Sequence, residues 1–231
     1  MGIMQRYFPE KMAVKLAEFV NADTFIETGT YSGKTTKWAA TKFKEVHTIE
    51  LSETLFAQYG KGLSSIGNIT PYFGDSRNIL PEILTAIHGN ILFWLDAHYS
   101  AGVTAGKEDP CPLLAELEMI LRRNNDDIIL IDDARCVDGT GGWPTISELL
   151  YYTVQKAGSK KRFMLICDDN IYIVPDEDKL KAALYEYSLQ RDTEMWNQIR
   201  NEKNKPKRLA RSVLKFLGIY NIAIKFYRNL K

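Results

Sequence analysis

The stretch that decides the fold is ETGTYSGKTT, residues 27–36. It follows a β-rich run, TFIET (24–28), and leads into a segment with helical character, GKTTKWAATKF (33–43). A glycine-rich turn between a strand and a helix lets the backbone approach a ligand, because glycine adopts φ values that other residues avoid. The stretch fits two kinds of ligand-binding turn, and the two imply different chemistry.

The first kind is a phosphate-binding loop, G-x-x-x-x-G-K-[ST], whose ending matches Gly33-Lys34-Thr35. The spacing before it does not match, because Thr28 stands where the first glycine of such a loop belongs. Glu27 also places a carboxylate where the phosphates of a nucleotide would lie, which is electrostatically unfavourable. Asp96 could still imitate the magnesium-binding aspartate of such proteins, so an NTPase or kinase stays the alternative.

Outside this stretch, short apolar runs alternate with helical patterns as far as residue 175. This alternation predicts an α/β fold with a doubly wound, mostly parallel sheet and a C-terminal antiparallel hairpin. Pro81 is expected to interrupt one of the helices. The predicted strands cover 24–28, 45–51, 68–75, 90–98, 127–134 and two runs within 162–175, and the predicted helices cover 9–20, 33–43, 53–63, 78–87, 111–123 and 145–157.

The composition is that of an ordinary soluble protein, with 45% hydrophobic and 26% charged residues among 231. Three widely spaced cysteines without a CxxC pair argue against a disulfide framework or a cysteine-based zinc site. No run approaches the roughly 18 apolar residues of a membrane span, and the N-terminus lacks the apolar core of a signal peptide. We therefore expect a cytoplasmic protein.

The charge is unevenly distributed along the chain. Residues 200–231 contain ten Lys or Arg and one Glu, a charge of +9, so the rest carries −8 against the total of +1. We expect a domain over 1–176 and a basic helical extension over 177–231, with a break at Pro206. The extension either packs on the sheet or on a second subunit of a homodimer, or lies on an anionic membrane surface. A nucleic acid is not an expected partner.

Acidic residues stand at the ends of the first four predicted strands: Glu27, Glu50, Asp75 and Asp96. In nucleoside-binding folds, an acidic residue about 20 positions after the glycine turn holds the ribose hydroxyls. Glu50 lies 23 residues after Glu27 and fits that role. A carboxylate in the turn itself suits a cofactor that carries an ammonium group and a sulfonium charge. Four such residues in order indicate a nucleoside cofactor more strongly than any one of them.

The chain thus resembles the Rossmann-like methyltransferases that use S-adenosylmethionine (SAM), over roughly residues 20–175. ETGTYSGKT is similar to the E-x-G-x-x-x-G-x-[ST] loop of the catechol O-methyltransferase group, and LDAHYS and LIDDAR resemble that group and the macrolide-sugar O-methyltransferases. The resemblance implies a Rossmann-like, seven-stranded fold. It also implies that Glu50 holds the ribose and that Asp75 with Ser76 meets the adenine edge. The methionine part would lie in the loop of Glu27, Thr28, Gly29, Thr30, Tyr31, Ser32 and Gly33, close to Asp96.

Two features depart from that family. A Pro-Gly-Gly turn before the fifth strand is replaced by RRNNDD, and the lysine base of the catechol enzymes is not found after Asp96. The acceptor and the base are therefore open. His98 is our candidate general base, beside Asp96, because its ordinary pKa suits proton transfer near neutral pH. It could instead be a metal ligand or a partner of Asp96.

Asp96, Asp132 and Asp133 end neighbouring strands, so their carboxylates can converge. Hard oxygen ligands of this kind select magnesium, which would orient and acidify a substrate hydroxyl. In the other interpretation, Asp132 caps the next segment and Asp133 pairs with Arg135.

Other residues have both a structural and a functional interpretation. The polar stretch 101–111 is a candidate lid, and Trp143 either stacks on a substrate ring or packs in the core. Glu116 and Glu118 lie two positions apart on a helix and face differently, which argues against a glycosidase carboxylate pair. Lys34 is expected to face solvent, with Thr35 and Thr36 helping to cap the turn.

The sequence therefore predicts a SAM-dependent methyltransferase that acts on a hydroxyl of a small molecule or sugar, with magnesium as a possible aid. The alternatives are a P-loop-like NTPase or kinase, and a nucleotide-binding interaction module without catalysis.

Overall fold

The computed structural model describes residues 8–96 and 111–216, with side chains as far as residue 201. The described part of the chain falls into two compact units, one that ends at Tyr187 and one that begins at Ser188. The first unit contains the sheet. Among the described residues, no helix is long and apolar enough to cross a membrane.

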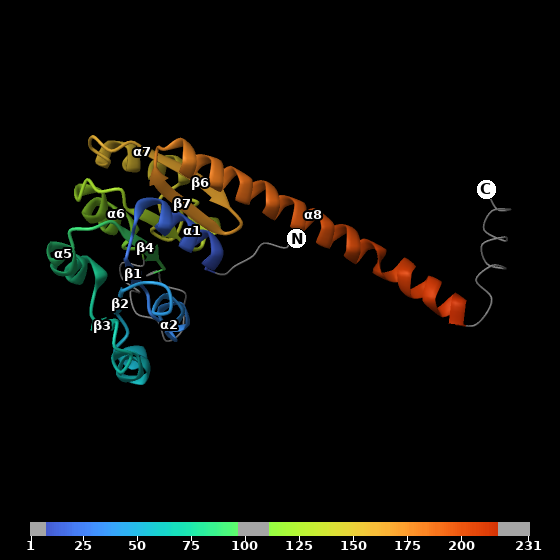
Figure 1. The fold of residues 1–231 in the computed structure, drawn as a ribbon, viewed down its shortest axis with the longest axis horizontal. Coiled ribbons are helices and arrows are strands. Elements are labelled where there is room, and N and C mark those ends of the chain that lie inside the picture. Colours follow the sequence, from blue (N-terminus) through green and yellow to red (C-terminus); the bar gives the residue numbers. More distant parts are fainter. Residues whose placement is uncertain (1–7, 97–110, 217–231) are drawn as a thin grey trace. The chain divides into compact units, whose positions relative to one another are not determined.

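A seven-stranded sheet with the order β3-β2-β1-β4-β5-β7-β6 forms the centre of the first unit (Figure 1). Neighbours from β3 to β5 run parallel, and β7 is antiparallel to both β5 and β6. This arrangement confirms the predicted fold class. The strands are β1 (Thr24–Thr28), β2 (Glu45–Glu50), β3 (Ile69–Phe73), β4 (Ile91–Leu95), β5 (Ile128–Ile131), β6 (Arg162–Cys167) and β7 (Asn170–Pro175).

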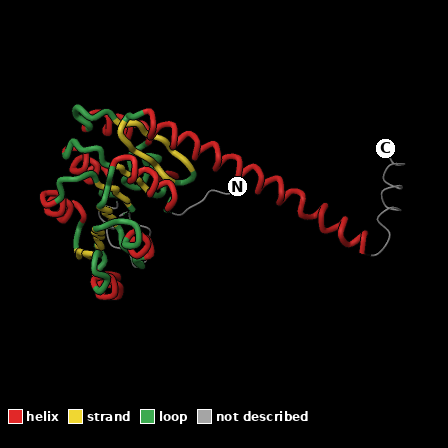
Figure 2. The backbone as a smooth tube through the Cα atoms, in the orientation of Figure 1, coloured by secondary structure: helices red, strands yellow, loops and turns green. Residues whose placement is uncertain are grey.

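Helices cover both faces of the sheet, and Figure 2 shows the strands enclosed between them. One apolar core joins the sheet to α1 (Glu10–Val20), α2 (Lys34–Ala39), α4 (Lys61–Ser64) and the start of α8 (Asp178–Phe216). The other joins it to α5 (Ser76–Ala86), α6 (Leu113–Arg122) and α7 (Ile146–Lys156). Successive strand residues alternate between the two cores, as Phe25 and Ile26 do.

Between β2 and β3 the helical segment has three parts: α3 (Glu53–Leu55), the π-helix η1 (Phe56–Gly60) and α4. A 3₁₀ turn, η2 (Ala134–Cys136), follows β5. The Asp-Asp-Asn turn predicted between β6 and β7 is present, with Asp168 in the left-handed region at φ 55°.

Two proline positions differ from the prediction. The sequence predicted an interruption at Pro81, yet α5 continues through it and begins earlier, at Ser76. The Asp75 side chain accepts a hydrogen bond from the Arg77 N–H and caps this helix. Leu80 and Ile83 are buried on either side of the proline. A cap is worth about 1 kcal/mol and each buried apolar side chain about 2 kcal/mol, which offsets the roughly 3 kcal/mol that an internal proline costs. At Pro206, likewise, α8 does not break.

The start of α8 belongs to the core of the first unit. Leu180 and Leu184 are fully buried there, although they follow the predicted boundary at residue 176. The change between the two units falls between Tyr187 and Ser188.

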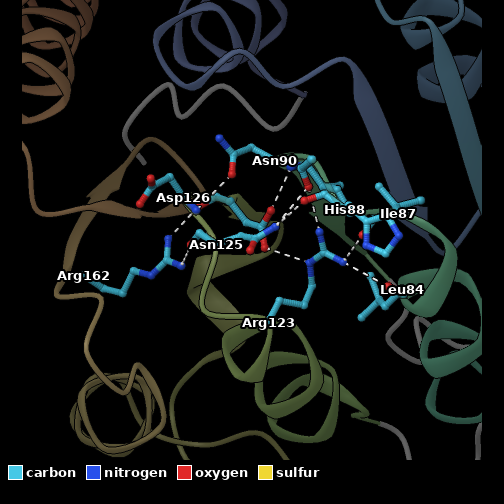
Figure 3. A network of polar contacts seen from close by, with 11 residues as sticks. Leu84, Ile87, His88, Asn90, Arg123, Asn125, Asp126 and Arg162 are labelled. Atoms are coloured by element: carbon cyan, nitrogen blue, oxygen red, sulfur yellow. Dashed lines mark hydrogen bonds and ion pairs between the residues drawn. The ribbon is translucent and has the colours of Figure 1, made fainter.

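A polar network holds the loops at the amino ends of β4 and β5 (Figure 3). Arg123 donates to the carbonyl oxygens of Leu84, Ile87 and Gly89 and forms an ion pair with the buried Asp127 (Nε–Oδ2 3.1 Å). Asp127 in turn accepts a hydrogen bond from the first N–H of β4, at Ile91. The network fixes where β4 and β5 begin. The predicted site lies at their opposite, carboxyl ends.

Candidate functional site

The glycine-rich loop connects the carboxyl end of β1 to α2. Gly29 has φ 89° and donates its N–H to the Ile49 carbonyl oxygen (2.9 Å). Gly33 has φ 67° and donates to the Thr30 carbonyl oxygen (2.8 Å). A Cβ at Gly33 would lie 2.9 Å from Leu63 Cδ2, so this position needs glycine for both its backbone angle and its space. The sequence predicted both glycine positions of the turn.

Glu27 lies beneath this loop and is only 2% exposed. Its Oε2 accepts hydrogen bonds from the hydroxyls of Thr36 (2.5 Å) and Thr48 (2.7 Å). Thr36 was expected to help cap α2; instead its side chain turns inward to Glu27, and the helix has no side-chain cap. Burial raises the pKa of Glu27 to about 7, although the two hydroxyls lower it and the nearby Glu50 raises it slightly further.

Glu50, at the end of β2, ties the loop to the sheet. Its Oε2 accepts the Tyr31 N–H and its Oε1 accepts the Ser52 N–H, both at 2.8 Å. Each carboxylate oxygen has two acceptor sites, so Glu50 can also receive the hydroxyls of a ribose. This geometry fits the role that the sequence predicted for Glu50.

Asp75 has a partner, Arg77, that was not predicted from the sequence. Besides capping α5, its carboxylate forms an ion pair with Arg77 (Nη2–Oδ2 2.6 Å). The hydrogen bonds from Arg77 lower the pKa of Asp75. Ser76 is buried at the first position of the helix. The motif Asp-Ser-Arg before an amphipathic run was a recognisable helix start, and the contact with adenine stays a prediction.

Asp96 and Asp132 stand side by side at the ends of β4 and β5. The Asp96 N–H donates to the Thr28 carbonyl oxygen (2.9 Å), and the Asp132 N–H donates to the Leu95 carbonyl oxygen (3.1 Å). Burial raises the pKa of Asp96 well above its ordinary value, and Asp132, Glu27 and Asp133 raise it further in that order. Glu27 in β1 and the aspartates that follow β4 and β5 therefore lie close enough to affect the pKa of Asp96.

The predicted magnesium ligands do not form a set. Asp133 adopts φ 54° and pairs with Arg135, which also pairs with the buried Asp169. Asp132 accepts the Asp133 N–H (2.8 Å). Across residues 8–96 and 111–201, no three His, Cys, Asp or Glu side chains gather as a metal site would require. The ion pair of Asp133 with Arg135 is the alternative to a metal role that was inferred from the sequence for this residue. Magnesium binding stays a prediction.

His98 and nearly all of the candidate lid, 101–111, lie outside the described residues. Trp143 is half-buried and packs against the core that contains β4, β5 and α6.

Glu116 is a buried acid that was not among the predicted site residues. This residue is buried on α6, in an apolar stripe with Leu113, Leu117 and Ile120. Burial raises its pKa to about 7, while the hydroxyls of Ser76 and Thr28 lower it in part. A glutamate in the middle of an i, i+3, i+4, i+7 apolar pattern was the available sign.

No protein-family profile and no curated protein sequence matches this chain. Solved structures do match. One is the O-methyltransferase from Bacillus cereus in complex with S-adenosylhomocysteine (SAH), with 18% identity over 74% of this chain and 82% of that one, at a TM-score of 0.51. Another is the O-methyltransferase TomG from Streptomyces achromogenes, involved in tomaymycin synthesis, in complex with SAM. Its identity is 15% over 73% of this chain and 79% of that one, at a TM-score of 0.50. The chain therefore has the fold of these SAM-dependent O-methyltransferases, as the resemblance in its sequence predicted.

Proposed function

We propose that this protein transfers a methyl group from SAM to a hydroxyl oxygen of a small molecule or sugar. The observation that carries the proposal is the loop Glu27–Gly33, which Glu50 holds at the carboxyl ends of β1 and β2. This is where the strand order of the sheet reverses between β1 and β4, the usual ligand crevice of a doubly wound fold. The similar folds from Bacillus cereus and Streptomyces achromogenes hold SAH and SAM.

The charges around the crevice suit SAM better than a nucleotide triphosphate. Glu27, Asp96 and Asp132 interact electrostatically at the strand ends, which favours a sulfonium and opposes several phosphate charges. Lys34, the residue that would reach the phosphates in a P-loop, is exposed. The NTPase alternative is therefore not favoured.

When bound, SAM supplies a methyl group on a positively charged sulfur. The loop around Gly29 and Gly33 would hold the methionine part, and the remaining acceptor sites of Glu50 would take the ribose hydroxyls. Asp75 and Ser76 would meet the adenine edge. Catalysis would then depend mainly on holding the acceptor oxygen in line with the methyl group.

Removal of the hydroxyl proton is assigned to His98 or Asp96. The raised pKa of Asp96 makes it a stronger base than an ordinary aspartate. We expect Asp96→Asn and His98→Gln to lower kcat more than they raise KM, and the larger loss of kcat identifies the base. Equal kcat values for both variants and the wild type would remove both from the reaction.

Magnesium assistance would require Asp133 to leave Arg135 and join Asp96 and Asp132. Turnover measured with excess EDTA and with Asp132→Asn decides this point. Unchanged turnover in both would rule the magnesium role out.

Turnover is the direct test of the function. The full chain, given SAM with a labelled methyl group, should form SAH only when a member of a panel of catechols, phenols and sugars is present. Glu50→Ala should lower kcat/KM for SAM by about tenfold to a hundredfold, since it removes charge-assisted hydrogen bonds. Glu53→Ala, an exposed neighbour on α3, is the matched control.

The alternative functions give different results in the same assay. SAM binding without turnover on any acceptor would indicate the interaction module, and ATP hydrolysis would indicate the NTPase. Dimerisation or membrane contact through the basic extension is a separate prediction. Light scattering of the full chain tests the dimer. Salt-sensitive binding to vesicles that contain phosphatidylserine, compared with phosphatidylcholine alone, tests the membrane contact.

A further inference from the structure

Glu116 is a buried acid that packing does not explain. The residue is 1% exposed, and its Oε1 has no hydrogen-bond partner within the described part of the chain. The hydroxyls of Thr28 and Ser76 lie close enough to lower the pKa of Glu116, yet neither Thr28 Oγ1, which is equally buried, nor Glu116 Oε1 completes a hydrogen bond within the described part of the chain. A buried polar atom without a partner costs about 1–3 kcal/mol, whereas leucine at position 116 would complete the apolar stripe of α6. An atom of this kind in a folded protein calls for a bound group that donates to it, either a water molecule or a ligand.

A small pocket lies beside Glu116. Its volume is about 10 Å³, which is room for one water-sized group. It is bounded by the last residues of β4 and β5, Leu95 and Ile131, by the start of α6, and by the Trp143 ring. Apart from the Cys111 thiol, the Glu116 carboxyl is the polar side chain of an otherwise apolar and aromatic lining. The pocket thus combines apolar walls with a single strong hydrogen-bond acceptor.

The pocket borders both the proposed cofactor residues and the carboxyl ends of β4 and β5. Thr28 belongs both to the cofactor loop and to the surroundings of Glu116, which also include Ser76 at the start of α5. Leu95 immediately precedes Asp96 and Ile131 immediately precedes Asp132, the acidic pair at the strand ends. The carboxyl group therefore stands between the cofactor side and the β4–β5 side of the crevice.

We infer that Glu116 is an acceptor-binding residue whose carboxyl receives a hydrogen bond from a hydroxyl or amino group that the acceptor inserts into this pocket. The inference rests on the proposed function and narrows it. The acceptor has an apolar or aromatic edge that packs against Trp143, and it carries a hydrogen-bond donor on that edge in addition to the hydroxyl that is methylated. An analogue without this donor leaves Oε1 unpaired and binds more weakly.

Two probes of similar shape test this assignment: phenol, which carries a hydroxyl donor, and toluene, which does not. Their binding to the full chain is measured by ligand-observed NMR, with and without saturating SAH. We expect the wild type to bind phenol about tenfold more tightly than toluene, the ratio that one buried hydrogen bond provides. Glu116→Leu should abolish that preference by weakening phenol and leaving toluene unchanged. Its melting temperature should equal or exceed that of the wild type, because a buried unpaired acid has been removed.

Glu118→Leu is the matched control. This glutamate lies two positions further on the same helix, where it pairs with Lys156 and Arg122 outside the pocket. The control should keep the preference for phenol. Should Glu116→Leu not fold, Glu116→Gln replaces it and should lower the preference severalfold, because the amide oxygen is a weaker acceptor than a carboxylate.

Three results would overturn the inference. They are no binding of either probe to the wild type at millimolar concentration, equal binding of the two probes to the wild type, or an undiminished preference for phenol over toluene in Glu116→Leu. Each would mean that Glu116 holds a water molecule or serves the fold alone. SAH affinity is recorded separately. A wild type that binds no SAH contradicts the proposed function, while the phenol preference without SAH still decides the role of Glu116.

Discussion

Gly33 shows how much one residue constrains the cofactor loop. Its φ of 67° is costly for any other residue, and an added Cβ would meet Leu63 at 2.9 Å. We predict that Gly33→Ala lowers the free energy of unfolding by about 1–2 kcal/mol. Urea unfolding measures this loss, and SAH affinity should fall with it. Gly62→Ala, in α4, is the control because nothing lies within 4 Å of its added Cβ. It should raise the free energy of unfolding by about 0.5–1 kcal/mol.

The buried Glu27 predicts a pH dependence of stability. Its pKa is about 7 in the folded protein, above the ordinary value of 4.5. The folded state therefore binds this proton more tightly than the unfolded chain does. Its contribution to stability is fully present below pH 4.5 and is lost as the pH rises to about 7, by at most about 3 kcal/mol. Glu116, whose pKa is also about 7, likewise makes the folded protein less stable as the pH rises.

The test compares unfolding free energies between pH 4.5 and 8. Glu27→Gln keeps an oxygen that accepts from Thr36 and Thr48 but cannot ionise, so the decline across this range should be smaller than that of the wild type by up to about 3 kcal/mol. Exposed Glu53→Gln should follow the wild-type curve. Identical curves for the wild type and Glu27→Gln would contradict the account of Glu27.

At the scale of residues, the sequence predicted those site residues whose position depends only on neighbouring residues along the chain. Gly29, Gly33, Glu27 and Glu50 follow from a turn and from strand ends, which are visible along the chain. It did not predict that Thr36 and Thr48 both bind Glu27 or that Arg77 binds Asp75. Glu116 was not predicted as a site residue for a different reason. Its importance depends on α6 lying against β1 and α5, and a helical pattern does not identify its neighbours.

At the scale of elements, the ion pair of Arg123 with Asp127 fixes the start of β4 and β5. The Arg123 side chain is 9% exposed and that of Asp127 is fully buried. Removing the arginine leaves the buried Asp127 carboxylate without its ion-pair partner and the carbonyl oxygens of Leu84 and Ile87 without the donor that Arg123 supplies. We predict that Arg123→Ala lowers the free energy of unfolding by about 3–5 kcal/mol. The neighbouring Arg122→Ala, whose side chain is 73% exposed, should cost at most about 1 kcal/mol. Equal losses in urea unfolding would show that the network does not hold these strands.

Helix boundaries were less predictable than helix identity. The period of apolar residues located α1, α6 and α7 well, because one face of each packs on the sheet. The interruption predicted at Pro81 in α5 was wrong, because the cost of a proline was overestimated there. Its cost is local, whereas the cap at Asp75 and the burial of Leu80 and Ile83 depend on the tertiary structure.

At the scale of the whole molecule, the fold was predictable because strands and helices alternate and the strands of the central sheet are apolar on both faces. The change in composition predicted that the first domain ends at residue 176, whereas the compact unit ends at Tyr187. The two differ because the first turns of α8 bury Leu180 and Leu184 in the core. Polar composition describes most of that helix, while a few apolar side chains decide where the first unit ends.

The central claim is that the crevice at the ends of β1, β2 and β4 binds SAM. Calorimetric titration of the full chain with SAH, SAM and ATP–magnesium tests it most directly. We expect saturable binding of SAH and SAM, no detectable binding of ATP, and an SAH affinity about tenfold to a hundredfold weaker in Glu50→Ala. Binding of ATP in the absence of any binding of SAH or SAM would contradict it.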